Sequence, residues 1–374
     1  MDNRSAKIKI VYILPTLDKG GAERLVVDLI LNLDRTVFEP MLILFKRGGE
    51  WLAELTAENV PVLILEKKKK ISPLNFWRIL SALKKIRPDI VHTHLGGDIY
   101  GRWAAKLIKV PVIVSTEHNI NIDEGFIYNI LKRFSVRAGR HIIAVSEAVK
   151  QDILSRYHIP TDQVSVIRNG VDTAKFLKRA KASANNQNAI NGRQPVIWGT
   201  MGRLSPQKGH LTLIEAWKKV DNNATCLIAG TGPLAKTLLK KIKQEGLRER
   251  IRLIGPVADP AAFLSSLDAF VFPSLWEGLG LVILEAGLIG LPVVASRVNG
   301  ITEIIKEDNG WLIPAGDAEA LATQINRLNA AMNDPSIIAK TDKLRAEVIA
   351  NFDIKNIAQK YQNLYRALLA NEQL

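Results

Sequence analysis

Residues 273–296 read PSLWEGLGLVILEAGLIGLPVVAS, and the interpretation of the whole chain depends on this stretch. Glu277 precedes a turn that holds Gly278 and Gly280, and an apolar run with helical character then carries a second acid, Glu285. A glycine turn at the start of a helix presents free backbone N–H groups to an anion. The stretch therefore favours a sugar-nucleotide site, although acids that only complement a helix dipole would give the same pattern.

Buried strand patterns alternate with helical patterns along the rest of the chain. In the first half the strands fall at 7–14, 41–45, 62–65, 88–94, 111–119 and 141–146, and in the second half at 196–201, 225–230, 251–254, 269–272, 292–295 and 310–313. This rhythm is typical of parallel sheets covered by helices, so the predicted fold class is α/β.

The length of 374 residues fits two domains of ordinary size. One stretch, 178–194, is polar and poor in apolar residues, which is typical of a linker or loop between domains. We therefore predict four parts: an N-terminal Rossmann-like domain at 1–177, a polar linker at 178–194, a C-terminal Rossmann-like domain at 195–352, and a final helix at 353–374.

The formal charge of +14 favours an anionic partner: nucleic acid, an acidic membrane surface or a phosphorylated ligand. Nucleic acid is not expected, because the chain has no zinc-finger spacing, no RNA-recognition aromatic signature and no long basic tail. The single cysteine, Cys226, excludes an intramolecular disulfide and a cysteine-rich metal site. No signal-peptide pattern and no apolar run of ~18 residues occur, so we expect a cytoplasmic protein. Within this expectation, the protein either stays in solution or contacts the inner face of the membrane peripherally.

One predicted helix is strongly basic. Four lysines precede it, and an aromatic residue lies in its second turn: Lys67, Lys68, Lys69, Lys70 and Trp77. Ser72 and Pro73 form a good N-cap and first-turn pair. The helix is either a core-packed surface helix with a solvated charged face, or an interfacial patch in which the tryptophan lies at headgroup depth and the lysines meet anionic lipid.

Polar residues follow several of the predicted strands. Gly20 and Gly21 separate the first strand from its helix. They form either a tight turn without a ligand or a contact to the phosphate of a sugar-nucleotide donor or to the acceptor of its sugar. His94 ends the strand at 88–94, and His118 lies at the end of the next one. Open α/β sheets bind ligands at the carboxyl ends of their strands, so the two histidines meet at one edge and His118 is the preferred functional candidate.

A second cationic loop follows the strand at 196–201. Gly202 and Arg203 begin it, and Lys208 lies five residues further on. Two cations at a strand end can converge on one phosphate with help from backbone N–H groups. The alternative is a pair of solvent-exposed loop charges.

Five segments in this order resemble the family 4 retaining glycosyltransferases, whose two facing Rossmann-like domains form the GT-B fold. The segments are Gly20–Arg24, Pro88–His94, Asn169–Asp172, Gly202–Leu204 with Lys208 and Gly209, and Glu277 with Glu285. The resemblance covers nearly the whole chain and implies a cleft between the domains and a last helix that crosses back to the first. Residues 298–303 depart from the family pattern, since they lack the Gly-Gly and proline that often precede the glutamate, so the sugar-edge contacts of that loop stay open.

The resemblance also implies roles for individual residues. Arg203 and Lys208 would neutralise the donor pyrophosphate, Glu285 would bind the ribose, Glu277 would contact sugar hydroxyl groups, and His118 would lie beside the transferred sugar. Backbone groups near the phosphates would come from Gly20, Gly21, Gly202, Gly280 and Leu281. On the acceptor side the candidates are His94 and Asn169.

Cleavage of a nucleotide-sugar bond places negative charge on the leaving diphosphate, and preorganised cations stabilise that charge. Other glycosyltransferase folds use a metal held by an Asp-x-Asp pair, and the chain contains no such pair. We therefore predict turnover without a metal or other cofactor, with the nucleotide sugar as co-substrate. No carboxylate stands out as the nucleophile of a double displacement, and the resemblance implies a front-face attack assisted by the donor phosphate.

The predicted function is transfer of a hexose or N-acetylhexosamine from a nucleotide diphosphate sugar, with UDP favoured over GDP. The predicted acceptor is a glycan or lipid-linked molecule of envelope polysaccharide or lipopolysaccharide-type biosynthesis. Two alternatives stay open. A sugar-nucleotide epimerase of the same fold would release product without an acceptor, and a non-catalytic binder of anionic surfaces would release no nucleotide at all.

Overall fold

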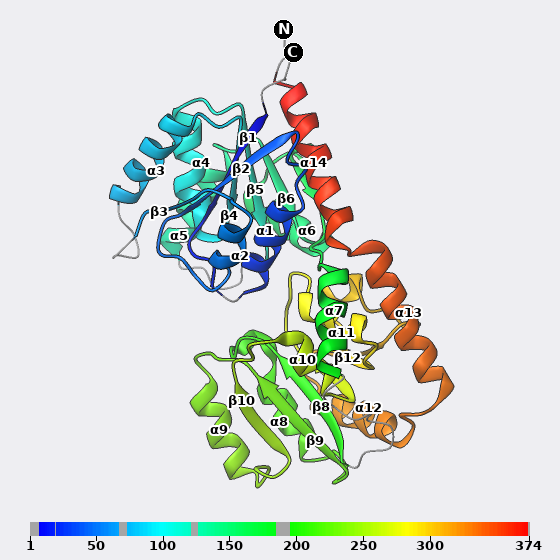
Figure 1. Ribbon diagram of the computed structural model, residues 1–374. Coiled ribbons are helices and arrows are strands. Elements are labelled where there is room, and N and C mark those ends of the chain that lie inside the picture. The colour runs from blue at the N-terminus through cyan, green and yellow to red at the C-terminus, as the bar shows by residue number, and fades with distance from the viewer. Residues whose placement is uncertain (1–6, 19, 67–72, 121–125, 185–194, 373–374) are drawn as a thin grey trace. The chain divides into compact units, whose positions relative to one another are not determined.

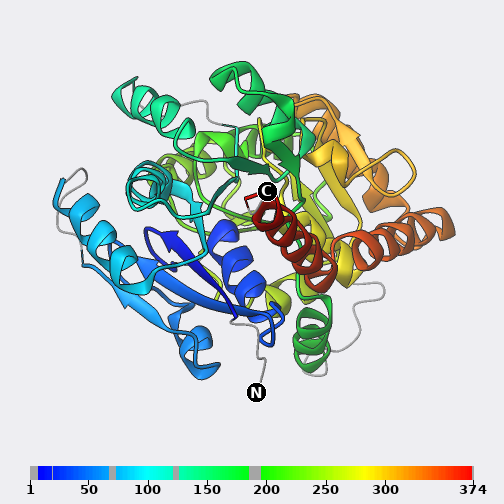
Figure 2. The same cartoon turned by 90° about the horizontal axis from the view of Figure 1, so that it is seen from above.

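The computed structural model describes residues 7–18, 20–66, 73–120, 126–184 and 195–372 of the chain. It contains two compact units. The first holds the chain up to Asn169 together with Ile354 onward, and the second runs from Gly170 to Asp353. Each has a parallel sheet covered by helices, as the sequence predicts (Figure 1 and Figure 2).

The first unit is built on a seven-stranded sheet in the order β3-β2-β1-β4-β5-β6-β7, and the strands pair in parallel. The strands are β1 (Ile8–Leu14), β2 (Phe38–Leu44), β3 (Val62–Ile64), β4 (Ile90–His94), β5 (Val112–Glu117), β6 (His141–Ala144) and β7 (Val164–Val166). The strand order changes direction between β1 and β4, and open α/β sheets bind ligands at the carboxyl end of such a switch point.

Helices cover both faces of this sheet. They are α1 (Gly21–Leu31), α2 (Leu52–Ala57), α3 (Pro73–Ile86), α4 (Asp98–Leu107), α5 (Phe126–Val136), α6 (Glu147–Tyr157) and α14 (Ile354–Ala370). Successive side chains of a strand point to opposite faces. In β1, Ile10 and Tyr12 therefore enter a core with α1 and α14, whereas Val11 and Ile13 enter a second core with α3 and α4.

The second unit has a six-stranded parallel sheet in the order β10-β9-β8-β11-β12-β13. Its strands are β8 (Val196–Met201), β9 (Ala224–Ala229), β10 (Ile251–Gly255), β11 (Ala269–Phe272), β12 (Val293–Ser296) and β13 (Trp311–Ile313). Its helices are α7 (Thr173–Ala184), α8 (His210–Trp217), α9 (Ala235–Gln244), α10 (Pro260–Ser265), α11 (Leu281–Ile289), α12 (Ala318–Ala330) and α13 (Pro335–Asn351). Trp198 and Trp217 are fully buried in its core.

The boundary between the units lies earlier than the sequence suggests. The stretch expected to begin a linker at 178 lies within α7, and residues 185–194 are outside the described part. Helix α7 is polar because most of it faces solvent, but Phe176 and Ala180 are buried. The helix belongs to the second unit, where it packs against α10 and α11.

The last helix belongs to the first unit, in agreement with the crossing that the resemblance implies. Ile357, Tyr361 and Tyr365 of α14 are buried in the core that α14 shares with α1. The Tyr365 hydroxyl lies 3.1 Å from the Tyr12 hydroxyl and 2.7 Å from Nδ1 of His92. These polar contacts fix the helix against β1 and β4.

Candidate functional site

A lysine and a glutamate meet at the carboxyl edge of the second sheet. Lys208 ends the short 3₁₀ turn after β8, and Glu277 lies between β11 and α11. The Lys208 Nζ is 2.5 Å from Glu277 Oε2 and 4.7 Å from the centroid of the Phe272 ring. Ser274 Oγ donates to Oε2 at 3.4 Å, and Gln207 Nε2 donates to Oε1 at 3.4 Å. The carboxylate is therefore held through both oxygens, while 17% of the lysine side chain stays exposed.

Close backbone approaches hold the Lys208 loop in place. Gly209 has a φ of +62°, and a Cβ there would lie 1.9 Å from the carbonyl oxygen of Pro273. A Cβ at Gly230 would lie 1.9 Å from the carbonyl oxygen of Gly202. Both positions require glycine because the neighbouring segment leaves no room for a side chain. The loop after β8 is thereby packed against the segments after β9 and β11, and this packing positions Lys208.

The N-terminus of α11 lies next to Glu277 in the chain. Gly280 has a φ of +87°, and the helix begins at Leu281 without a side-chain cap among the described residues. The glycine turn that the sequence predicts at a helix start is therefore confirmed, and such a start attracts anions. Glu285 is the fifth residue of α11, so it lies one turn into the helix.

Arg203 is placed differently from Lys208. It is exposed in the loop after β8, and the next residue, Leu204, is buried and anchors that loop. The backbone N–H of Leu204 donates to the carbonyl of Thr231 at 2.8 Å. Arg203 lies outside the Lys208–Glu277 pair, so convergence of both cations on one phosphate stays a prediction.

Three histidines lie at the carboxyl edge of the first sheet. His92 and His94 belong to β4, and His118 directly follows β5. Nδ1 of His94 is 2.9 Å from Nε2 of His118, and the His92 and His94 ring centroids are 4.1 Å apart. Two neighbouring strand ends thus bring their histidines together, as the sheet topology predicts.

Burial keeps these histidines uncharged. It lowers the pKa of His118 to about 4 and lowers the pKa values of His92 and His94 well below the usual range. Within a neutral His94–His118 pair one ring donates to the other, which leaves one N–H and one bare nitrogen. The remaining ring nitrogens, Nε2 of His94 and Nδ1 of His118, have no hydrogen-bond partner among the described residues. The pair therefore keeps one further N–H and one further bare nitrogen, and both atoms are buried.

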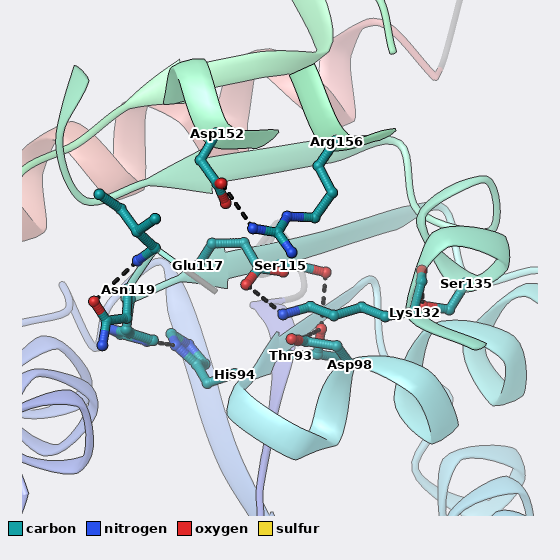
Figure 3. A network of polar contacts seen from close by, with 12 residues as sticks. Thr93, His94, Asp98, Ser115, Glu117, Asn119, Lys132, Ser135, Asp152 and Arg156 are labelled. Carbon is teal, nitrogen blue, oxygen red and sulfur yellow. Dashed lines mark hydrogen bonds and ion pairs between the residues drawn. The ribbon is translucent and has the colours of Figure 1, made fainter. Parts of the chain in front are cut away.

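A buried ion-pair network lies beside this pair, as Figure 3 shows for Lys132 and Glu117. The Lys132 Nζ donates to Glu117 Oε2 at 2.7 Å, and Arg102 Nη2 donates to Glu117 Oε1 at 3.5 Å. Burial alone would raise the pKa of Glu117, but Lys132 and Arg102 outweigh it and hold that pKa below its usual value. Since Glu117 directly precedes His118, the network fixes the strand end that carries the histidine.

The same network extends to α4. Arg102 Nε donates to Ser115 Oγ at 2.5 Å, and Thr93 Oγ1 donates to Asp98 Oδ1 at 2.8 Å. Burial raises the pKa of Asp98 to about 7, although Arg102 opposes this. The network joins α4 and α5 to β4 and β5.

The remaining predicted residues are spread over the first unit. Gly20 precedes α1, which has no side-chain cap among the described residues, and Gly21 is its first residue. Asn169 is buried, and within the described part its Oδ1 has no hydrogen-bond partner. Trp77 is 59% exposed on α3, whereas the lysines at 67–70 lie outside the described residues.

Sequence reasoning missed several residues at both edges. Gln207 and His210 flank Lys208 and Gly209, and burial, with a contribution from nearby Lys208, lowers the pKa of His210 to about 4. Their proximity to the motif could have indicated them. Lys132 gave no comparable signal, because only the packing of α5 brings it to Glu117.

Two negative findings apply to the described part of the chain. It contains no group of three or more His, Cys, Asp or Glu side chains arranged to hold a metal ion. None of its helices combines the length and the apolar character that crossing a membrane requires.

Two Rossmann-like units, each built on a parallel sheet, match the fold of GT-B glycosyltransferase structures. The family described as Glycosyltransferase Family 4 matches residues 19–175, and the one described as Glycosyl transferases group 1 matches residues 195–330. The chain belongs to the family 4 glycosyltransferases.

Relatives of known sequence or structure agree with this assignment. The UDP-Gal:alpha-D-GlcNAc-diphosphoundecaprenol alpha-1,3-galactosyltransferase of Escherichia coli is 29% identical, with 100% of each chain covered. The amylovoran biosynthesis glycosyltransferase AmsK of Erwinia amylovora is 26% identical, over 97% of this chain and 88% of its own. The crystal structure of Anabaena HepE in complex with UDP and glucose superposes with a TM-score of 0.82 at 22% identity, over 96% of this chain and 100% of HepE.

Proposed function

We propose that this glycosyltransferase moves a hexose or N-acetylhexosamine from a UDP-sugar to a glycan or lipid-linked acceptor of envelope polysaccharide biosynthesis, with retention of anomeric configuration. The name of the E. coli relative includes a UDP-sugar donor and a diphosphoundecaprenol acceptor, and AmsK is named for the synthesis of a polysaccharide. The HepE structure holds UDP and glucose. These names favour UDP over GDP and a lipid-linked acceptor.

The observation that carries the proposal is the Lys208–Glu277 pair beside the N-terminus of α11. When the bond between the anomeric carbon and the diphosphate breaks, the leaving oxygen gains negative charge. The Lys208 side chain is partly exposed, and α11 begins at Leu281 without a side-chain cap among the described residues; both features support stabilisation of such charge. Arg203 supplies the second cation, and Glu285 binds the ribose.

Glu277 then acts on the sugar rather than on the phosphate. Its carboxylate is held by Lys208, Ser274 and Gln207, so it is oriented to accept hydrogen bonds from sugar hydroxyl groups. In the proposed front-face reaction the acceptor oxygen bonds to the anomeric carbon on the side that the diphosphate leaves. The acceptor proton passes to a donor phosphate oxygen, so no protein carboxylate becomes glycosylated.

On the side of the first unit, His118 contacts a hydroxyl group of the transferred sugar. Its pair with His94 leaves one hydrogen-bond donor and one acceptor, and neither ring carries charge near pH 7. Asn169 has an unpaired buried amide oxygen within the described part and is a second candidate for polar contact on the acceptor side.

We propose that the reaction proceeds without a metal ion. Lys208 and Arg203 are placed on the loop after β8 to supply the positive charge that a metal supplies in other glycosyltransferase folds. Activity should therefore persist in excess chelator. A loss of activity in chelator that added Mg²⁺ or Mn²⁺ restores would contradict this part of the proposal.

A donor panel tests the function. Thermal shift with UDP-galactose, UDP-glucose, UDP-N-acetylglucosamine and GDP-mannose identifies the donor, since a ligand at 100 times its Kd stabilises by ~2.7 kcal/mol. Nucleotide release is then measured with and without a diphosphoundecaprenol-linked sugar, and NMR gives the anomeric configuration of the product. Release of an epimerised sugar without acceptor would identify an epimerase instead, and no nucleotide release from any donor would favour a non-catalytic binder.

A lipid-linked acceptor requires the enzyme to work at a membrane surface. We therefore propose peripheral contact with an acidic membrane. The predicted contact through Trp77 and Lys67, Lys68, Lys69 and Lys70 is supported only at Trp77, which is exposed on α3.

A further inference from the structure

Gln207 joins the two loops that form the Lys208–Glu277 pair. It lies in the 3₁₀ turn after β8, directly before Lys208. Its backbone carbonyl accepts a hydrogen bond from the N–H of Leu275 at 2.7 Å, and its Nε2 donates to the carbonyl of Trp276 at 3.0 Å. Gln207 is therefore bound to the segment that carries Glu277 through both its backbone and its side chain.

A second loop packs against the same segment. Gly300 has a φ of +84°, and a Cβ there would lie 2.4 Å from the carbonyl oxygen of Gly278 and 2.7 Å from that of Glu277. The two backbones leave no room for a side chain between them. The backbone of Glu277 is thus fixed by the turn of Gln207 and by the loop of Gly300, which leaves the orientation of its carboxylate to side-chain contacts.

The two oxygens of the Glu277 carboxylate are held in different ways. Oε2 lies 2.5 Å from Lys208 Nζ and accepts from Ser274 Oγ at 3.4 Å. Among the residues that the structure describes, Oε1 accepts only from Gln207 Nε2, at 3.4 Å. Contacts at one oxygen allow a carboxylate to turn about that atom, whereas a contact at each oxygen fixes its plane. Gln207 supplies the second point.

The three donors also differ in how strictly they direct a hydrogen bond. An ammonium group is a compact charge with three rotatable donors, and a hydroxyl hydrogen rotates to suit its acceptor. A primary amide is planar, so once one N–H points at the Trp276 carbonyl, the direction of the other N–H is set. Lys208 and Ser274 therefore attach the Glu277 carboxylate, and Gln207 gives it a direction.

This direction matters for a sugar, because epimers differ only in the direction of one hydroxyl group. A donated hydrogen prefers to lie near the plane of the oxygen that accepts it. A carboxylate with a fixed plane therefore pairs well with the hydroxyl of one epimer and poorly with that of the other, and poorly paired polar groups cost affinity. A carboxylate that can turn would follow either hydroxyl.

We propose that Gln207 is a positioning residue that fixes the plane of the Glu277 carboxylate and thereby sets the discrimination between epimers of the donor sugar. This role rests on the proposed function, because it takes Glu277 as the residue that contacts the sugar. Gln207 acts through Glu277 and not by a contact of its own with the donor.

Isothermal titration calorimetry with the full chain tests this role without acceptor or turnover. The ligands are UDP alone and two pairs of C4 epimers: UDP-galactose with UDP-glucose, and UDP-N-acetylgalactosamine with UDP-N-acetylglucosamine. Gln207→Met keeps the length of the side chain and removes its donors. In the pair that the wild type distinguishes better, the ratio of the two Kd values should shrink by about 10-fold, while the Kd of UDP should stay within about twofold.

Gln207→Glu is a second variant with nearly the same shape. Its carboxylate cannot donate to the Trp276 carbonyl and repels Glu277, so the Kd ratio should shrink at least as far as in Gln207→Met. A side chain that only filled space would tolerate this change.

Two controls separate direction from attachment. Gln151 Nε2 donates to Glu147 Oε1 at 2.9 Å at an exposed site on α6, so Gln151→Met loses the same kind of contact and should leave every Kd unchanged. Ser274→Ala removes a contact to Oε2 of Glu277, which Lys208 still holds. This variant should weaken both epimers by a similar factor and keep their Kd ratio.

Three results would overturn the role of Gln207. These are an unchanged Kd ratio in Gln207→Met, an equal loss of affinity for UDP and for both epimers, and a wild type that binds the epimers of each pair equally. Circular dichroism checks that each variant is folded. Absence of sugar transfer to any acceptor would contradict the proposed function but would not alter these Kd ratios, so the two failures are distinguishable.

Discussion

The carboxyl edges of the two sheets share one topology but carry different chemistry. In the second unit the edge holds a charged pair, Lys208 and Glu277, whose side chains are 17% and 11% exposed. In the first unit the edge holds His94 and His118, which burial keeps neutral. The charges of the first unit, such as Glu117, are enclosed beneath this edge.

Both sheets are parallel, so the difference in charge between the two edges comes from burial and not from strand order. A partly solvated cation stabilises a phosphate that gains charge in the reaction. Neutral imidazole rings instead hold one N–H and one bare nitrogen, so they can form hydrogen bonds without any change in charge. The enclosed ion pairs of the first unit hold the neutral edge in shape. Four measurements test this division, from the largest expected effect to the smallest.

Lys132→Met should destabilise the first unit by about 3–5 kcal/mol, because Glu117 would lose its closer partner in a buried site. Urea unfolding followed by circular dichroism measures the change. The matched control is Arg297→Met, which removes an ion pair to Glu307 that is largely exposed, and it should have no measurable effect. Equal stability of both variants would show that the enclosed charges do not support the edge.

Lys208→Ala and Arg203→Ala should each lower kcat/KM by about 10²- to 10³-fold, or ~3–4 kcal/mol of transition-state stabilisation. The physical reason is the loss of a preorganised cation at the leaving diphosphate. Steady-state nucleotide release measures the effect, and Lys236→Ala, at an exposed position on α9, serves as the control. Activity within threefold of wild type in the Lys208 variant would refute its assignment.

Stability should fall as the pH falls from about 6.5 towards about 4. The pKa of His118 and that of His210 are lowered to about 4 in the folded protein, so the unfolded chain binds protons in this window that the folded chain does not. Each such histidine changes the free energy of unfolding by about 1.4 kcal/mol per pH unit. Asp98 has the opposite effect on stability. Its pKa is raised to about 7 in the folded protein, so as the pH falls the folded chain takes up this one proton before the unfolded chain does, which stabilises the fold. His92 and His94, whose pKa values are also lowered, reinforce the loss of stability.

Urea midpoints at about pH 7.5 and about pH 5 measure this dependence. His210→Gln should reduce the slope, because glutamine does not titrate. A midpoint that does not change with pH would show that the histidines are charged in the folded state.

His94→Gln should have the smallest effect, a 3- to 10-fold lower kcat/KM, which corresponds to the net ~0.5–1.5 kcal/mol of one hydrogen bond. The variant keeps a polar side chain but changes the partner that orients His118. His141→Gln is the control, since His141 bonds Ser165 on β7. If kcat/KM falls equally in both variants, the effect is structural and His94 does not position His118.

The sequence predicted the βα rhythm of both units well, because buried parallel strands are short apolar runs bounded by turns. It also predicted that Gly280 opens a helix and that His94 and His118 share an edge. It misplaced the boundary near residue 178, because α7 is polar on most of its surface and resembles a linker. It missed Lys132, since only the packing of α5 brings that residue to Glu117.

The sequence by itself determined which chemical groups this protein has: the two glutamates of residues 273–296, the cations at 203 and 208, and the glycine turns between them. Local patterns carry that information because turns and helix starts depend on neighbouring residues. Only the tertiary structure decided that Lys208 pairs with Glu277 and that the histidines are neutral. Pairing, burial and exposure depend on packing between distant segments, which residue order does not show.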